Sequence, residues 1–208
     1  EVLAPAPYFV EYGFYVGNHL GVFRPVPSLP KTFQLDLTAM EAAITPKTRA
    51  VIINTPHNPT GQVYSAESLK ALSALLARKS AEYGRPIILV SDEPYRFLTF
   101  DGIKVPALLP LYEYAVVAGS FSKSLGLAGE RIGYLAMPPR LALRTESILR
   151  VNSWMATPPM AEIATQWIEN GTVQALLAEQ RKQLSWRQAQ VKNNLGPYLR
   201  GHHAHALF

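Results

Sequence analysis

One apolar run that ends in hydroxyl groups and a lysine decides how this sequence is interpreted. Residues 114–124 read Tyr-Ala-Val-Val-Ala-Gly-Ser-Phe-Ser-Lys-Ser, so residues 114–119 have the composition of a buried strand that delivers Lys123 just past its end. Long cationic side chains are rarely buried unless they are paired or reactive, because desolvation of an ammonium group is costly and makes the amine nucleophilic. Lys123 therefore has the setting that Schiff-base chemistry needs.

The residues around this lysine are suited to phosphate binding. Ser120 and Ser122 supply hydroxyl groups, and Arg131, eight positions past Lys123, supplies a guanidinium group for charge-assisted hydrogen bonds. A lysine beside a phosphate site suggests pyridoxal 5'-phosphate as the cofactor. From this segment alone, an equally good interpretation makes Lys123 a solvated loop residue and Arg131 a surface charge.

Two further apolar runs also end in polar residues. Asn-Pro-Thr-Gly at residues 58–61 follows the run 49–54, and Ser-Asp-Glu-Pro-Tyr at residues 91–95 follows the run 86–90. Each motif alone is an ordinary turn signal. In open α/β sheets, however, ligands bind at the carboxyl ends of parallel strands. We therefore expect these two strand ends to converge with Lys123 on one site.

The order of the predicted elements favours an alternating α/β domain. A strand is expected at residues 21–27, and a short helix at residues 38–44 with Thr38 as its N-cap. After the strand at residues 49–54, Ser65 is expected to cap a longer helix with leucines on one face. The strand, helix, strand order requires a parallel pair with a right-handed crossover.

The character of the sequence changes to mostly helical from residue 138 onward. Helices are predicted at residues 141–151, 159–169 and 173–195. The basic residues of the last helix are better explained by a solvated face than by a nucleic-acid site.

The composition fits a cytoplasmic enzyme. The chain has 208 residues, of which 48% are hydrophobic and 17% are charged, and no segment has the unbroken apolar length of a membrane span. The absence of cysteine excludes disulfides and thiolate metal sites, and we expect no metal. The net charge of +5 is spread along the chain, which suits an anionic cofactor and acidic substrates better than nucleic acid.

At these motifs the chain resembles the class I and II aminotransferases, which are fold type I enzymes dependent on pyridoxal phosphate. The resemblance covers nearly the whole chain. It implies that Lys123 forms the Schiff base, that Asp92 pairs with the pyridine nitrogen, and that Asn58 and Tyr95 donate hydrogen bonds to the phenolic oxygen. Lys123, Asp92 and Tyr95 are the implied catalytic residues.

The same resemblance assigns the remaining cofactor contacts. Ser120, Ser122 and Arg131 match phosphate ligands. Residues 7–12, Pro-Tyr-Phe-Val-Glu-Tyr, resemble the segment whose aromatic side chain stacks on the pyridine ring, and Phe9 takes that place.

The resemblance also implies the fold and the domain organisation. We expect a mostly parallel sheet flanked by helices, with residues 1–150 as a portion of the cofactor-binding large domain. Residues 151–208 are expected to lead into a C-terminal small domain that is incomplete. The upstream phosphate contacts and the arginine that holds a substrate carboxylate are not visible, so we expect an excerpt of a longer enzyme that is inactive alone and homodimeric when intact.

The implied function is transfer of an amino group between an amino acid and a 2-oxo acid. Another fate of the same carbanion, as in a C–S lyase or a decarboxylase, uses the same residues and remains open. A third alternative is the aminotransferase-like effector domain of a MocR-type transcription regulator, and nucleic acid would be a partner only if a DNA-binding domain lay upstream.

Overall fold

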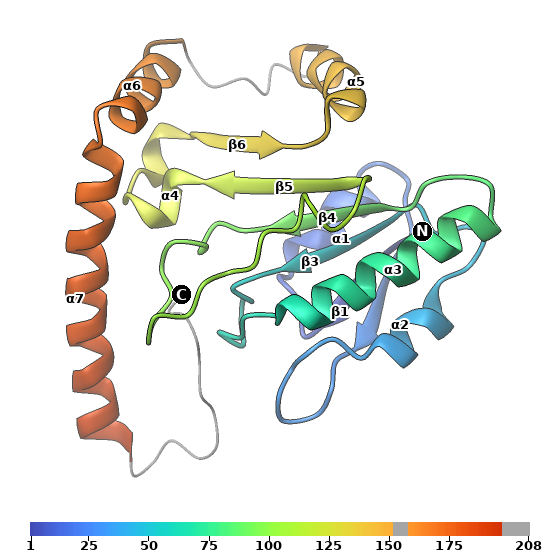
Figure 1. Cartoon of the computed structure of the whole chain (residues 1–208), viewed down its shortest axis with the longest axis horizontal. Coiled ribbons are helices and arrows are strands. Elements are labelled where there is room, and N and C mark those ends of the chain that lie inside the picture. Colours follow the sequence, from blue (N-terminus) through green and yellow to red (C-terminus); the bar gives the residue numbers. More distant parts are fainter. Residues whose placement is uncertain (152–157, 197–208) are drawn as a thin grey trace.

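A six-stranded sheet organises the computed structural model, which describes residues 1–151 and 158–196 (Figure 1). The strand order is β2-β1-β3-β4-β5-β6, and every neighbouring pair is parallel except β5 and β6. The expected mostly parallel sheet is therefore confirmed. The strands are β1 (Val2–Ala6), β2 (Phe23–Pro27), β3 (Ala50–Asn54), β4 (Ile88–Asp92), β5 (Ala115–Ser120) and β6 (Gly133–Ala136).

Helices lie on both sides of this sheet. In Figure 1, α2 and α3 lie in front of the strands and α1 lies behind them, while α7 runs along the end of the sheet near α4. The three predicted C-terminal helices are present within two residues of their expected bounds. The helical elements are α1 (Glu11–Gly17), α2 (Leu37–Ala43), α3 (Ala66–Glu82), α4 (Phe121–Ser124), the 3₁₀ turn η1 (Ala128–Glu130), α5 (Pro139–Val151), α6 (Pro158–Glu169) and α7 (Thr172–Leu195).

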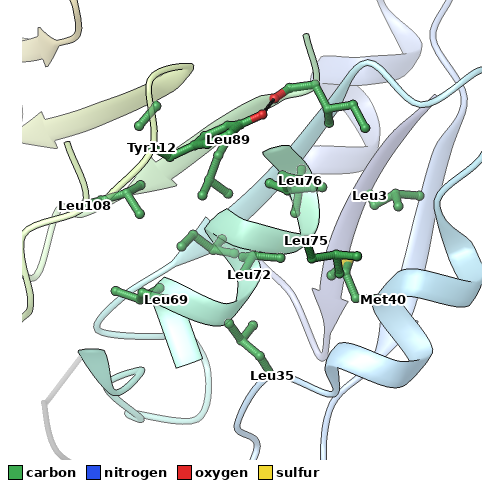
Figure 2. Packing of buried hydrophobic residues seen from close by; sticks show 14 of the residues in the cluster. Leu3, Leu35, Met40, Leu69, Leu72, Leu75, Leu76, Leu89, Leu108 and Tyr112 are labelled. Atoms are coloured by element: carbon green, nitrogen blue, oxygen red, sulfur yellow. Dashed lines mark hydrogen bonds between the residues drawn. The ribbon is translucent and has the colours of Figure 1, made fainter. Parts of the chain in front are cut away.

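The hydrophobic core lies between α3 and the sheet (Figure 2). Leu69, Leu72 and Leu76 recur at helical spacing and are at most 1% exposed, because this face of α3 packs on the strands. Leu3 of β1 and Leu89 of β4 meet them from the sheet, and both are fully buried. This packing sets the distance between α3 and the strands, and it leaves the carboxyl ends of the strands free for a site.

The N-caps of the two helices in front of the sheet differ in how well they were predicted. Ser65 caps α3 as expected, and its hydroxyl oxygen accepts a hydrogen bond of 3.0 Å from the backbone N–H of Ser68. The helix predicted at residues 38–44 is present as α2, but its predicted N-cap was wrong, because the helix begins at Leu37 and Asp36 is its N-cap. The Asp36 carboxylate accepts from Ala39 N at 2.9 Å, so Thr38 lies inside the first turn.

The sheet register brings the carboxyl ends of three strands together. Asn54 of β3 is paired with Asp92 of β4, and Asp92 is paired in turn with Ala118 of β5. On the far side of β5, the antiparallel strand β6 approaches so closely that a Cβ on Gly133 would lie 2.8 Å from the carbonyl oxygen of Gly119. A glycine is therefore required there for β6 to pair with the strand that carries Ser120.

None of the helices in residues 1–151 and 158–196 is long and apolar enough to cross a membrane.

Candidate active site

A cleft of about 290 Å³ opens at the carboxyl edge of the sheet, where β3, β4 and β5 end. Seven of the eight residues predicted for the site line it, and Arg131 does not. The convergence of the three strand ends is thus present in the structure. The lining residues are Phe9, Tyr12, Tyr15, Asn54, Asn58, Asp92, Pro94, Tyr95, Ser120, Ser122 and Lys123.

The floor of the cleft holds a paired carboxylate. Asp92 is the last residue of β4, and the hydroxyl of Tyr12 on α1 donates a 2.6 Å hydrogen bond to its Oδ2. Burial raises the pKa of Asp92, and the hydrogen bond from Tyr12 offsets part of that rise. Burial and the nearby Asp92 charge raise the pKa of Tyr12, so the tyrosine remains a protonated donor.

The adjacent carboxylate, Glu93, binds a different set of residues. It accepts from the Ser91 hydroxyl at 2.7 Å and forms an ion pair with Arg96, and its side chain is fully buried. Arg96 also donates to the Val105 carbonyl at 3.0 Å, which ties the loop after β4 to the sheet. Of these two neighbouring acids, Asp92 alone lines the cleft.

Two asparagines connect the strand ends across the cleft. The side-chain amide of Asn54 donates to the Asp92 carbonyl at 2.7 Å, and Asn54 Oδ1 accepts from the backbone N–H of Asn58 at 2.6 Å. Burial and the Asp92 charge raise the pKa of Tyr95, and a hydrogen bond with the Asn58 side chain partly offsets this. Asn58 and Tyr95 therefore lie together beside Asp92, as the predicted site requires.

Aromatic side chains form one wall of the cleft. Phe9 contacts Tyr12 edge to face, with ring centroids 5.7 Å apart and an angle of 79° between the rings. Tyr15 follows one helical turn later at the rim, where its hydroxyl donates to the Glu11 carboxylate. That hydrogen bond raises the pKa of Tyr15 to about 12.

The hydroxyl groups and the lysine that line the cleft lie at the start of α4. Ser120 is the N-cap of α4, and its Oγ accepts from Ser122 N at 3.1 Å. The Ser124 hydroxyl donates to the Ser120 carbonyl at 3.2 Å, which closes this short turn. The expectation of a buried lysine was wrong for this chain: Lys123 is exposed, because the four-residue helix places it at the open mouth of the cleft.

Arg131 lies beside the cleft rather than in its lining. It holds a left-handed backbone conformation, with φ of 55°, and its guanidinium donates to the Ala128 carbonyl at 3.0 Å. It lines a neighbouring groove between β5, β6 and α5. Its charge still reaches the rim, where it offsets a small part of the rise in the pKa of Tyr15. The assignment of Arg131 to the phosphate stays a prediction.

Four residues that line the cleft were not among the predicted site residues: Tyr12, Tyr15, Asn54 and Pro94. Tyr12 and Tyr15 follow Phe9 at spacings of three and six, which places them on one helical face, and this spacing was a usable signal. Asn54 is the last residue of its apolar run and could have been found as a strand-end amide. Elsewhere in the described residues, no three His, Asp or Glu side chains gather in an arrangement that could hold a metal ion.

Comparisons with known proteins agree with this geometry. The family model for aminotransferases of class I and II matches residues 1–201. An aromatic-amino-acid aminotransferase from Thermococcus litoralis is 34% identical over 167 residues, which is 78% of this chain and 41% of that protein. An aspartate aminotransferase from Geobacillus stearothermophilus is 41% identical over 143 residues, which is 66% of this chain and 35% of that protein.

A solved structure matches the whole chain. A tetra mutant of the aspartate aminotransferase of Thermus thermophilus superimposes with a TM-score of 0.86 at 28% identity, and the match covers 100% of this chain and 56% of that one. The chain thus spans well under two thirds of the length of these relatives. The matched family model, together with this shared fold, shows that the chain belongs to the aminotransferase class I and II family.

Proposed function

We propose that the protein to which this chain belongs is a pyridoxal-phosphate-dependent aminotransferase that moves an amino group between an amino acid and a 2-oxo acid. One observation carries the proposal: a single cleft joins a half-buried carboxylate, Asp92, to the side chains of Asn58 and Tyr95 and opens onto Lys123. Members of this family are generally pyridoxal-phosphate-dependent, and the relatives reported above are all named aminotransferases.

The residues present fit this cofactor. Asp92 would face the pyridine nitrogen, Asn58 and Tyr95 the phenolic oxygen, and Phe9 the face of the ring. The volume of about 290 Å³ is near the lower end of small-molecule sites. Phosphate would lie at the start of α4, with Ser120, Ser122 and Arg131 as its ligands. When bound, the cofactor supplies an electron sink for the charge released as a substrate Cα loses its proton.

The side chains of this chain would hold that charge and move the proton. Asp92 would serve as the counter-ion of a protonated ring nitrogen, and the Tyr12 hydroxyl would orient the carboxylate and stabilise its charge. Lys123 would hold the cofactor through Nζ. The same amine, at the mouth of the cleft, would take the proton from the substrate Cα as a general base and return it as a general acid.

Domain organisation, assembly and location complete the proposal. Residues 1–150 would form part of the cofactor-binding domain, and residues 151–208 would lead into a further domain. A homodimer is supported by exposed apolar side chains on and after α1, where Phe14 is 66% exposed and Leu20 97%. The composition supports a cytoplasmic location.

Borohydride reduction of the full-length protein with bound cofactor tests the lysine assignment. We expect loss of the visible absorbance and a cofactor label on the peptide that carries Lys123. A Lys104→Arg variant, changed on the loop after β4, serves as the control and should label normally. A label on Lys47, Lys70 or Lys104 instead would refute the assignment.

Product analysis separates transamination from the alternatives. A 2-oxo acid formed in equal amount with a new amino acid supports transamination, whereas release of CO₂ or of a thiol would show another carbanion chemistry. The regulator alternative predicts sequence-specific DNA binding by the full-length protein without turnover, and no observation in this chain favours it.

A further inference from the structure

Glu93 is a carboxylate that follows Asp92 directly in the chain and does not line the cleft. Its side chain is fully buried, whereas the side chain of its partner Arg96 is 25% exposed. Burial raises the pKa of the Glu93 carboxyl group, and the Ser91 hydroxyl and the Arg96 guanidinium offset part of this rise. The proposed chemistry does not use Glu93, although burial of a charge lowers stability unless the charge is well paired.

The two carboxylate oxygens of Glu93 bind residues on either side of the segment that carries Asp92 and Tyr95. Oε1 accepts from the Ser91 hydroxyl at 2.7 Å, one residue before Asp92. Oε2 accepts from the Arg96 guanidinium, one residue after Tyr95. Because side chains alternate along a strand, the Ser91–Glu93 contact lies on the face of β4 opposite the Asp92 side chain. The two bonds therefore enclose both cleft residues and leave the Asp92 face free.

The backbone of Glu93 connects the same turn to the sheet. The Glu93 N–H donates to the Ala118 carbonyl of β5 at 2.7 Å, and the Glu93 carbonyl accepts from Arg96 N at 3.2 Å. Arg96 is held in turn, because its guanidinium also donates to the Val105 carbonyl at 3.0 Å, at the end of the loop after β4. Glu93 is thus the residue at which the strand end, the neighbouring strand and the turn are joined.

We propose that Glu93 and Arg96 are positioning residues that together hold the turn after β4, so that Asp92 and Tyr95 face the cleft at the same time. The consequence for cofactor binding rests on the proposed function, whereas the effect on the turn does not. An apolar side chain of similar length could fill the buried volume, but it has no oxygen to accept from Ser91 and Arg96. Without the pair, Asp92 stays in β4 while Tyr95 loses its fixed direction.

The turn is tested first without cofactor. In the full-length apo protein, hydrogen exchange of the Arg96 amide reports local opening of the turn, because this amide donates to the Glu93 carbonyl. In Glu93→Met the Arg96 amide should exchange about tenfold faster, the factor for one lost hydrogen bond to a charged group. The Leu89 amide, which donates to the Tyr114 carbonyl at 3.0 Å, should change much less. Equal acceleration of both amides, or an unchanged Arg96 amide, would overturn the proposal.

Cofactor affinity then tests whether the two residues act as one unit. Glu93→Met and Arg96→Met should each weaken binding of pyridoxal phosphate to the full-length protein about tenfold, and the double variant should bind no more weakly than either single variant. Glu93→Gln should restore most of the affinity, because its oxygen can accept from Arg96 and its amide can donate to Ser91. A Glu93→Gln variant as weak as Glu93→Met, or an additive loss in the double variant, would contradict the proposed pair.

The same substitution in an ion pair remote from the cleft provides the control. Glu113 and Arg140 are exposed and form an ion pair of 2.7 Å near the amino end of β5, so Glu113→Met should change neither the exchange of the Arg96 amide nor the affinity. If Glu93→Met binds the cofactor like the parent protein, Glu93 is a packing residue only and the proposal is wrong. If the parent protein binds no cofactor, the proposed function fails, and the exchange of the Arg96 amide still decides the role of the pair.

Discussion

Replacement of Tyr12 by phenylalanine removes the hydroxyl that donates to Asp92 Oδ2. The bond is 2.6 Å long and its acceptor is a partly buried carboxylate. Hydrogen bonds to charged groups contribute about 1.5–3 kcal/mol, and partial exposure places this one near the lower end. The pKa of Asp92, which burial already raises, should therefore rise further in Tyr12→Phe, because the charged carboxylate loses a hydrogen-bond donor.

The sign of the stability effect follows from the direction of that pKa shift. A carboxyl group whose pKa is raised by folding lowers the stability of the protein as the pH rises through that pKa. The Tyr12 hydroxyl reduces this loss of stability, because it donates a hydrogen bond to the charged carboxylate. Tyr12→Phe should therefore cost about 1.5 kcal/mol of unfolding free energy at pH 8. The cost should shrink at acidic pH, where Asp92 is protonated in both proteins.

Two measurements check this prediction against a matched control. Carboxyl ¹³C NMR titration of the apo protein reports the pKa of Asp92, and urea unfolding at pH 8 and at acidic pH reports the free energy. Tyr112→Phe is the control, because Tyr112 donates to the neutral Ile87 carbonyl at 2.7 Å and its loss should be independent of pH. An Asp92 pKa that is the same in Tyr12→Phe and in the parent would refute the reasoning.

Three further predictions concern a buried histidine, the strand pair and the helix cap. Burial lowers the pKa of His57 from 6.5 to about 4. The free energy of unfolding should therefore fall by about 3 kcal/mol as the pH falls from 6.5 to 4, because the buried imidazole must take up a proton. Unfolding of His57→Gln over the same pH series should not show this fall. Gly133→Ala should lower the melting temperature because its Cβ meets a β5 carbonyl, whereas Gly129→Ala, with open space around it, should be neutral in the same thermal scan. Asp36→Ala should cost about 1 kcal/mol in urea unfolding and Thr38→Ala much less, and a larger loss for Thr38→Ala would contradict the observed cap.

The site was predictable from sequence wherever polar residues directly follow an apolar run. Asn58, Asp92 and Ser120 lie at or just after strand ends, and parallel pairing forces such ends to one edge of the sheet. The bounds of these strands were predictable from local composition alone. Ser65 was also found locally, because an N-cap acts on an amide three residues away.

The remaining features depend on contacts that the local sequence does not carry. Tyr12 meets Asp92 across 80 residues of chain, and only the assembled sheet brings them together. The position of Arg131 depends on a left-handed backbone after η1 that a non-glycine residue rarely adopts. Asp36 and Thr38 are both good N-cap residues, and the extended backbone of Asp36 decided between them.

The register that pairs Asn54 with Asp92 makes the cleft an assembly of three strands rather than a feature of any one of them. A partly formed sheet would present no binding surface, so a small molecule bound in the cleft binds the assembled sheet alone. At a ligand concentration 100 times Kd, such binding stabilises the assembled state by about 2.7 kcal/mol. The supply of ligand during synthesis would then set the fraction of molecules that reach the folded state. A shortage of ligand would lower the amount of folded protein before it changed the properties of each folded molecule.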